Sequence, residues 1–161
     1  MSQHFSSHDG SAIVTDLVSV IVANREYLSE VDGAIGDGDH GINMAKGFAH
    51  CGRTLEGRQL SLAEALDELT LSLMEGIGGS MGPLYGSLFI GMADEVRGCE
   101  DIDGATFAHL LRGGLTSLQD ITEAGVGDPP GFRLDDCSSQ RNLSDAGRAQ
   151  ARRVAAAFAA A

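Results

Sequence analysis

Apolar residues recur along most of the chain at the three- and four-residue spacing of amphipathic helices. Ser61 and Glu64 have the spacing of a capping box, in which each side chain caps the backbone N–H of the other residue, so a helix is predicted to start there. No segment keeps the two-residue period of a strand for long, and the sequence therefore predicts an all-α fold. The first helix is predicted over residues 11–30. The apolar positions of the predicted helices are Ile13, Val14, Leu17, Val18, Ile21 and Leu28; Ile42, Ala45, Phe48 and Ala49; Leu62, Leu66, Leu69 and Leu73; Leu88, Phe89, Met92 and Val96; and Phe107, Leu110, Leu111, Leu118 and Ile121.

Short polar or glycine-rich stretches separate these helices. Loops are predicted from Asp32 to Gly41 and over residues 52–59, 76–83 and 101–106. Because short connections join neighbouring helices in opposite directions, the expected architecture is an antiparallel helix bundle.

The charge of the chain changes abruptly after Asp128. Residues 1–128 hold 20 Asp and Glu against 6 Lys and Arg, whereas residues 129–161 hold 3 against 5. The sequence therefore predicts a helical domain over residues 1–128 and a divergent tail over residues 129–161. The formal net charge of −12 would repel a phosphate backbone, so a nucleic-acid partner is not expected.

The location of the protein is predicted from three weaker signals. No apolar run approaches the roughly 20 residues of a membrane span, and the first ten residues, "MSQHFSSHDG", lack the pattern of a signal peptide. The three cysteines are odd in number and far apart, which is not typical of a disulfide framework. A cytoplasmic protein without a membrane partner is expected.

Three aspartates lie close together in "VDGAIGDGDHGINM", residues 31–44. Asp32, Asp37 and Asp39 would repel one another unless protons or cations intervene. Hard cations such as Mg²⁺ take oxygen ligands and usually keep waters or substrate phosphates in their other positions. The cluster is therefore a candidate metal site.

Glycines and a helix start accompany these aspartates. Gly36, Gly38 and Gly41 are expected to take positive φ and to fold the carboxylates around one centre. A helix predicted to begin near His40 would offer free N–H groups and its positive dipole end to phosphate. Asn43, on the first turn of that helix, could reach the same point.

Three interpretations of this loop compete. A calcium-binding EF-hand is excluded, because the spacing differs and no Glu closes a twelve-residue loop. A plain Asp/Gly turn with Asp39 as the helix N-cap remains open. The third interpretation is a site for Mg²⁺ and nucleotide phosphates.

A second glycine-rich segment, "GIGGSMGPLYG" at residues 76–86, favours the nucleotide site. Gly78 and Gly79 would let the backbone approach a ligand closely, and Ser80 adds a hydroxyl. A helix break forced by glycine and Pro83 is the simpler alternative. One acidic and one neutral glycine-rich segment together suit one nucleotide, with its metal and phosphates at the first segment.

The two motifs together resemble the nucleotide-binding L subunit of dihydroxyacetone (glycerone) kinase, from about Tyr27 to Asp128. The resemblance implies an antiparallel barrel of eight helices that holds ADP or ATP and two Mg²⁺ at one end. It implies that Asp32, Asp37 and Asp39 bind the metals. The nucleotide contacts that it implies are His40, Gly41, Ile42 and Asn43 in the first motif, and Ser80 and Met81 beside Gly79 in the second.

The function that the resemblance implies is phosphoryl transfer to dihydroxyacetone held on a partner K subunit, in a dimer or heteromer. A phosphohistidine on an M subunit recharges the bound nucleotide in the phosphotransferase version of the family, whereas free ATP is used in the fused version. The alternatives are a kinase domain for another small ketose or a fatty acid, and a non-catalytic remnant that keeps metal, nucleotide or partner binding.

The sequence departs from the family pattern at two places. The usual "GGASGP" reads "GGSMGP" here, which puts Met81 where a hydroxyl is usual. After "EAGVGD" at residues 123–128 the family pattern stops. The barrel is therefore expected to be incomplete at its C-terminal end and to bind nucleotide more weakly than a complete subunit.

Overall fold

Helices make up most of the structure, a computed structural model that describes residues 4–34, 36–79 and 81–121. Within these residues the all-α prediction is confirmed, with one small two-stranded sheet as an addition. The predicted tail, residues 129–161, lies outside the described residues, so the boundary at Asp128 stays a prediction. The elements are β1 (His4–Ser6), the 3₁₀ turn η1 (Ser7–Asp9), α1 (Gly10–Ala23), α2 (Arg25–Gly33), α3 (His40–Leu55), α4 (Leu62–Gly76), α5 (Met81–Val96), β2 (Asp101–Asp103) and α6 (Gly104–Ile121).

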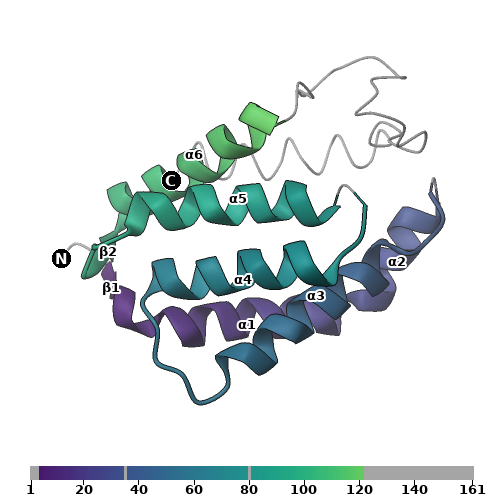
Figure 1. Cartoon of the computed structure of the whole chain (residues 1–161), viewed down its shortest axis with the longest axis horizontal. Coiled ribbons are helices and arrows are strands. Elements are labelled where there is room, and N and C mark those ends of the chain that lie inside the picture. Colours follow the sequence, from purple (N-terminus) through teal and green to yellow (C-terminus); the bar gives the residue numbers. More distant parts are fainter. Residues whose placement is uncertain (1–3, 35, 80, 122–161) are drawn as a thin grey trace. The chain divides into compact units, whose positions relative to one another are not determined.

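Helix α4 lies at the centre of the described helices. It packs against α5 on one side and against α1 and α3 on the other (Figure 1). The predicted leucine stripe of α4 is buried throughout, and small residues bury the other side of the helix. A helix that buries most of its circumference must lie inside the fold rather than on its edge. The buried residues of α4 are Leu62, Ala63, Ala65, Leu66, Leu69, Thr70, Ser72 and Leu73.

The helices α4, α5 and α6 run back and forth, as the predicted short connections require (Figure 1). Helix α2 packs against α3. The end of α2, the start of α3 and the link from α4 to α5 lie toward the same end of the helices, at the right of Figure 1. Helices α3 and α5 therefore both present their N-termini, the positive ends of their dipoles, at that end.

The first predicted helix is in fact two helices. The backbone of Asn24 departs from helical geometry between α1 and α2, at φ −98° and ψ 13°. The carbonyl oxygen of Val20 accepts two hydrogen bonds from Asn24, one of 2.8 Å from its side-chain amide and one of 3.1 Å from its backbone N–H. The apolar spacing does not reveal this change of backbone geometry.

Two predicted loops are shorter than expected. Helix α3 continues through residues 52–55, and helix α5 starts at Met81, so that it includes Pro83. Proline is tolerated there because the first N–H groups of a helix have no intrahelical partner. Pro83 therefore belongs to the first turn of α5 instead of breaking a helix.

The predicted turn at residues 101–106 is wrong in its first half. Residues 101–103 form β2, which pairs antiparallel with β1 so that Phe5 lies opposite Ile102. The side chain of Ile102 is 1% exposed and belongs to the core. Three residues are too few to give a strand its recognisable alternation, and the pairing partner is distant in sequence.

The capping box at the start of α4 is confirmed. The carboxylate of Glu64 accepts a 2.9 Å hydrogen bond from the Ser61 backbone N–H, and the Glu64 N–H donates to Ser61 Oγ at 3.4 Å. The hydrogen bonds from the Ser61 backbone and side chain lower the pKa of Glu64 below its usual value. The box is therefore made by the ionised carboxylate.

Replacing Ser61 by alanine is expected to lower the free energy of unfolding by about 1 kcal/mol, because the backbone N–H of Glu64 loses the hydroxyl that caps it. Because the pKa of Glu64 is lowered in the folded state, the box stabilises the fold above the usual glutamate pKa and stops doing so as the pH falls. In urea unfolding, the difference in the free energy of unfolding between wild type and Ser61→Ala should therefore become smaller in acid. Ser19→Ala, an exposed mid-helix change, is the matched control, and an equal loss in both variants would contradict the prediction.

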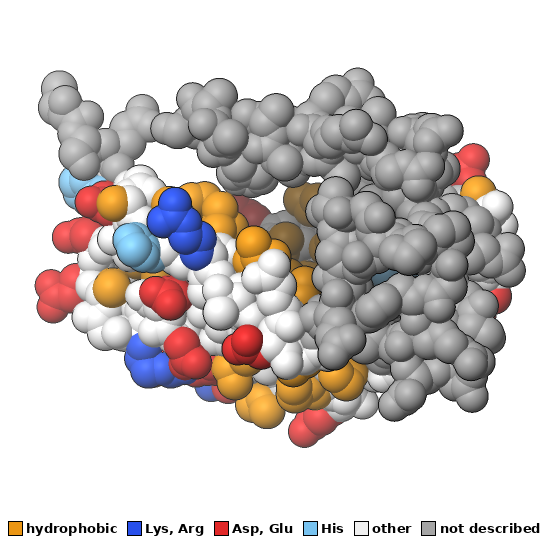
Figure 2. Space-filling model, turned by 90° about the horizontal axis from the view of Figure 1, so that it is seen from above, with side chains coloured by type: hydrophobic (Ala, Val, Ile, Leu, Met, Phe, Trp, Pro, Cys, Tyr) orange, Lys and Arg blue, Asp and Glu red, His pale blue; other side chains and the backbone are white. Residues whose placement is uncertain are grey.

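The surface of the described residues is acidic and partly apolar. Acidic side chains are spread over the described part of the face in Figure 2, with basic side chains at a few points. Helix α6 buries only Leu110 and Gly114, while Phe107, Leu115 and Ile121 are exposed. None of the described helices combines the length and apolar character that crossing a bilayer requires.

Candidate metal centre

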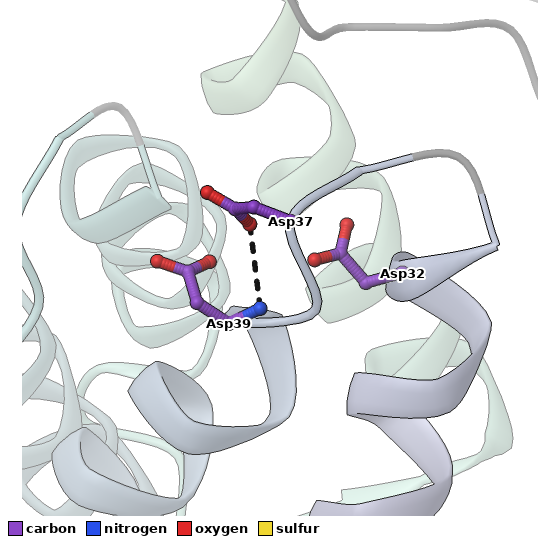
Figure 3. A group of neighbouring side chains, drawn as sticks. All are labelled: Asp32, Asp37 and Asp39. Carbon is purple, nitrogen blue, oxygen red and sulfur yellow. Dashed lines mark hydrogen bonds between the residues drawn. The ribbon is translucent and has the colours of Figure 1, made fainter.

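The three predicted metal ligands converge. Asp32 lies near the end of α2, Asp37 lies in the connecting loop, and Asp39 immediately precedes α3. One carboxylate oxygen of each lies within 4.8 Å of the other two. Figure 3 shows the three side chains gathered around one region between the two helices. The half-buried Asp32 lies beside the two exposed aspartates.

Asp32 also organises the loop. Its Oδ2 accepts hydrogen bonds from the backbone N–H of Gly38, at 2.9 Å, and of His40, at 3.4 Å. Its backbone carbonyl accepts a hydrogen bond from the N–H of Gly36. One carboxylate thus fixes the loop backbone and still shares the space between the helices with two others.

The carboxylates of Asp37 and Asp39 each accept one hydrogen bond from the described residues, whereas that of Asp32 accepts two. Asp37 Oδ1 accepts a hydrogen bond of 3.3 Å from the backbone N–H of Asp39 (Figure 3). Asp39 Oδ2 accepts one of 2.8 Å from the side-chain amide of Asn43, one turn into α3. Asn43 therefore orients a candidate ligand directly.

The expectation that all three loop glycines take positive φ is wrong for two of them. Only Gly38 does so, at φ +78°. A Cβ on Gly36 would lie 2.6 Å from Asp32 Oδ1. A Cβ on Gly41 would overlap the carbonyl oxygen of Arg25 and come within 2.7 Å of the backbone nitrogen of Ser29. Gly36 and Gly41 are needed for close approach, the first beside a carboxylate and the second between α2 and α3.

The plain-turn interpretation predicts that the Asp39 side chain caps α3. Asp39 does occupy the N-cap position, yet its side chain makes no capping hydrogen bond to the backbone. The carboxylate faces the cluster and Asn43 instead. The geometry thus favours a ligand-binding role over a simple cap.

The charge of the cluster is not balanced by the described protein. None of the three carboxylates forms an ion pair with a basic side chain of the described residues. Three carboxylates within one ion's reach repel one another, and oxygen ligands of this kind suit a hard divalent cation. The residues present therefore fit Mg²⁺.

The other predicted contacts in the first motif start helix α3. His40 is half-buried at the first helical position, Gly41 is buried against α2, and Ile42 is 49% exposed. The first N–H groups of a helix lack intrahelical acceptors, which makes this end of α3 suitable for an anion.

The second motif adds Gly79 and Met81 at the same end of the helices. Gly79 has φ +70° and open space around it, so the backbone can approach a ligand there. Met81 begins α5, and its half-buried side chain packs against the core. Ser80 lies outside the described residues. The assignment of these residues to nucleotide binding stays a prediction.

The sequence pattern did not indicate a role for Tyr85, whose half-buried side chain also packs against the core. The Tyr85 hydroxyl lies 3.4 Å from His40 Nε2, and the two rings meet edge to face with centroids 6.1 Å apart. This contact joins the start of α3 to the first turns of α5. The tyrosine is part of the second motif, but no spacing signal places it against a histidine 45 positions earlier.

Comparisons with known proteins identify relatives of this chain. The family model of the DAK2 domain matches residues 34–129. The chain is 38% identical over 109 residues to the ADP-binding subunit DhaL of PTS-dependent dihydroxyacetone kinase from Lactococcus lactis, a match covering 67% of this chain and 54% of that protein. It is 31% identical to the corresponding subunit of a PEP-dependent dihydroxyacetone kinase from Listeria innocua, over 71% of this chain and 58% of that protein. It is also 33% identical to the mouse triokinase/FMN cyclase, over 73% of this chain and 20% of that protein.

The matches with the bacterial subunits span little more than half of their length. The family model, in contrast, covers more than half of this chain and includes Asp37, Asp39 and the second glycine-rich segment. The protein therefore belongs to the DAK2 domain family.

Proposed function

We propose that this chain binds ADP or ATP together with two Mg²⁺ and serves phosphoryl transfer to dihydroxyacetone held on a partner K subunit. The observation that carries the proposal is the convergence, at the N-terminus of α3, of three carboxylates that form no ion pair with the described residues. The names of the bacterial relatives, ADP-binding subunits of dihydroxyacetone kinases, support the choice of nucleotide and acceptor.

Each residue of the proposed site has a distinct task. Asp37 and Asp39 would bind metal, and Asp32 would do so while it holds the loop backbone. Bound Mg²⁺ would neutralise phosphate charge during transfer. The N–H groups at the start of α3 would bind phosphate oxygens. Because the acceptor is held by the partner, no general base is required of this chain.

The proposed partners follow from the same relatives. Two of them are named as PTS-dependent and PEP-dependent kinases, which supports a donor derived from phosphoenolpyruvate. We propose that the nucleotide stays bound and is recharged by a phosphohistidine on an M subunit, in a dimer or heteromer. This arrangement requires the phosphate end of the bound nucleotide to be reachable by both partners in turn.

Calorimetric titration tests the binding step. ADP with Mg²⁺ should bind with a dissociation constant between about 1 μM and 1 mM, and ADP with EDTA should give no heat. The metal dependence is expected because the three carboxylates would otherwise repel the phosphates. Equal binding with and without Mg²⁺, or none with Mg²⁺, would contradict the proposed site.

A reconstituted reaction tests the transfer step. Purified K and M subunits, phosphoenolpyruvate and the general phosphotransferase proteins are combined with the chain, and dihydroxyacetone phosphate is measured. Product that requires the chain supports the kinase function. Binding of Mg²⁺-ADP without product, while a full-length bacterial subunit is active, would favour the non-catalytic alternative.

A further inference from the structure

We propose that Tyr85 is a positioning residue for His40: its hydroxyl donates to Nε2, holds the imidazole at the start of α3, and leaves the Nδ1 proton free to donate to a phosphate oxygen. The contact itself is independent of any ligand. The identity of the acceptor as phosphate rests on the proposed function.

The first support is geometric. The hydroxyl oxygen of Tyr85 and Nε2 of His40 are 3.4 Å apart, and the rings are inclined by 63°. His40 directly follows Asp39, so its ring orientation is set at the edge of the carboxylate cluster. Tyr85 lies on α5, and Phe89, one turn further along the same helix, is buried in the core. A helix fixed by the core thus holds the side chain of His40 at the loop end of α3.

The second support is the direction of the hydrogen bond. Burial raises the pKa of Tyr85 above its usual value, so the hydroxyl keeps its proton at neutral pH. A half-buried tyrosine O–H normally finds an acceptor. Among the described residues, Nε2 of His40 is the one acceptor found for it. The hydroxyl is therefore able to donate to the ring nitrogen, and the proposal assigns it that role.

The chemical consequence concerns the other ring nitrogen. A neutral imidazole that accepts at Nε2 carries its proton on Nδ1. No hydrogen bond of Nδ1 is found within the part of the chain that the structure describes. A fixed N–H donor is thus available beside three carboxylates whose cations would bring phosphate oxygens to this point. An imidazole free to rotate would offer this donor only part of the time.

Nuclear magnetic resonance of the ring nitrogens tests the inference without any ligand. At about pH 8.5, above the ordinary pKa of histidine, Nε2 of His40 should resonate as an unprotonated nitrogen and Nδ1 as a protonated one. In Tyr85→Phe, which keeps the ring contact and loses the hydroxyl, the Nε2-protonated form should become populated. Tyr27→Phe changes the other tyrosine, which is 55% exposed, and should leave the His40 signals unchanged.

Mg²⁺-ADP titration gives the second readout. Tyr85→Phe should raise the dissociation constant about three- to tenfold, the size expected for one hydrogen bond, and Tyr27→Phe should not. In a His40→Ala background the Tyr85→Phe change should have no further effect, because its influence passes through the imidazole.

Two results would overturn the inference. The first is a neutral His40 imidazole in the wild type that carries its proton on Nε2. The second is a set of His40 signals that do not change in Tyr85→Phe. The wild-type spectrum decides the first even if the variant folds poorly. If wild type fails to bind Mg²⁺-ADP, the proposed function fails, and the ring spectra still decide the role of Tyr85.

Discussion

Asp37→Asn is expected to weaken Mg²⁺-dependent ADP binding at least about 100-fold, which corresponds to about 2.7 kcal/mol. Asparagine keeps the shape of the side chain but removes one of three negative charges that would hold the cations. The same change relieves repulsion in the metal-free protein. The unfolding temperature of Asp37→Asn without Mg²⁺ should therefore equal or exceed that of wild type. Mg²⁺-ADP should no longer raise the unfolding temperature of the variant.

Asp37 is the best of the three aspartates for this test. Asp32 holds two backbone N–H groups of the loop, and Asp39 accepts from Asn43, so changes there would disturb structure as well as charge. Asp37 accepts only one long hydrogen bond among the described residues. Asp101→Asn, an exposed change of equal charge on β2, is the control. Unaltered Mg²⁺-ADP affinity in Asp37→Asn would exclude the carboxylate cluster as the metal site.

Features that depend on near neighbours in sequence were predictable. The leucine stripe of α4 and its capping box follow from residues three or four positions apart, and both are found as expected. Asp32, Asp37 and Asp39 lie within eight residues, which favours their convergence, and the packing of α2 against α3 completes it. The candidate metal centre was therefore visible in the sequence.

Features that depend on distant contacts were not predictable. The pairing of β1 with β2 joins residues 4–6 to residues 101–103, and neither segment is long enough to show a strand pattern. The contact of Tyr85 with His40 bridges two motifs that periodicity treats separately. The packing role of Gly41 requires knowing that α2 turns back against α3.

Gly41→Ala is expected to destabilise the fold by about 3 kcal/mol. A methyl group at this position would overlap the carbonyl oxygen of Arg25 and lie 2.6 Å from Ser29 Oγ. The oxygen of Arg25 belongs to the backbone and cannot rotate away, so α2 must move from α3. Asp32 lies on α2, and Asp39 immediately precedes α3. Mg²⁺-ADP affinity should therefore fall together with stability.

The control for this change distinguishes two roles of the glycine. If Gly41 served only to make the loop flexible, alanine at this helical position would be neutral or stabilising, because alanine favours helices. Gly104→Ala, at the start of α6 with open space around it, should behave in that way. Urea unfolding of both variants, followed by Mg²⁺-ADP titration, measures the difference. Equal stability of the two variants would mean that α2 and α3 are not held together through Gly41, and the close packing of the two helices could not then explain how Asp32 reaches Asp39.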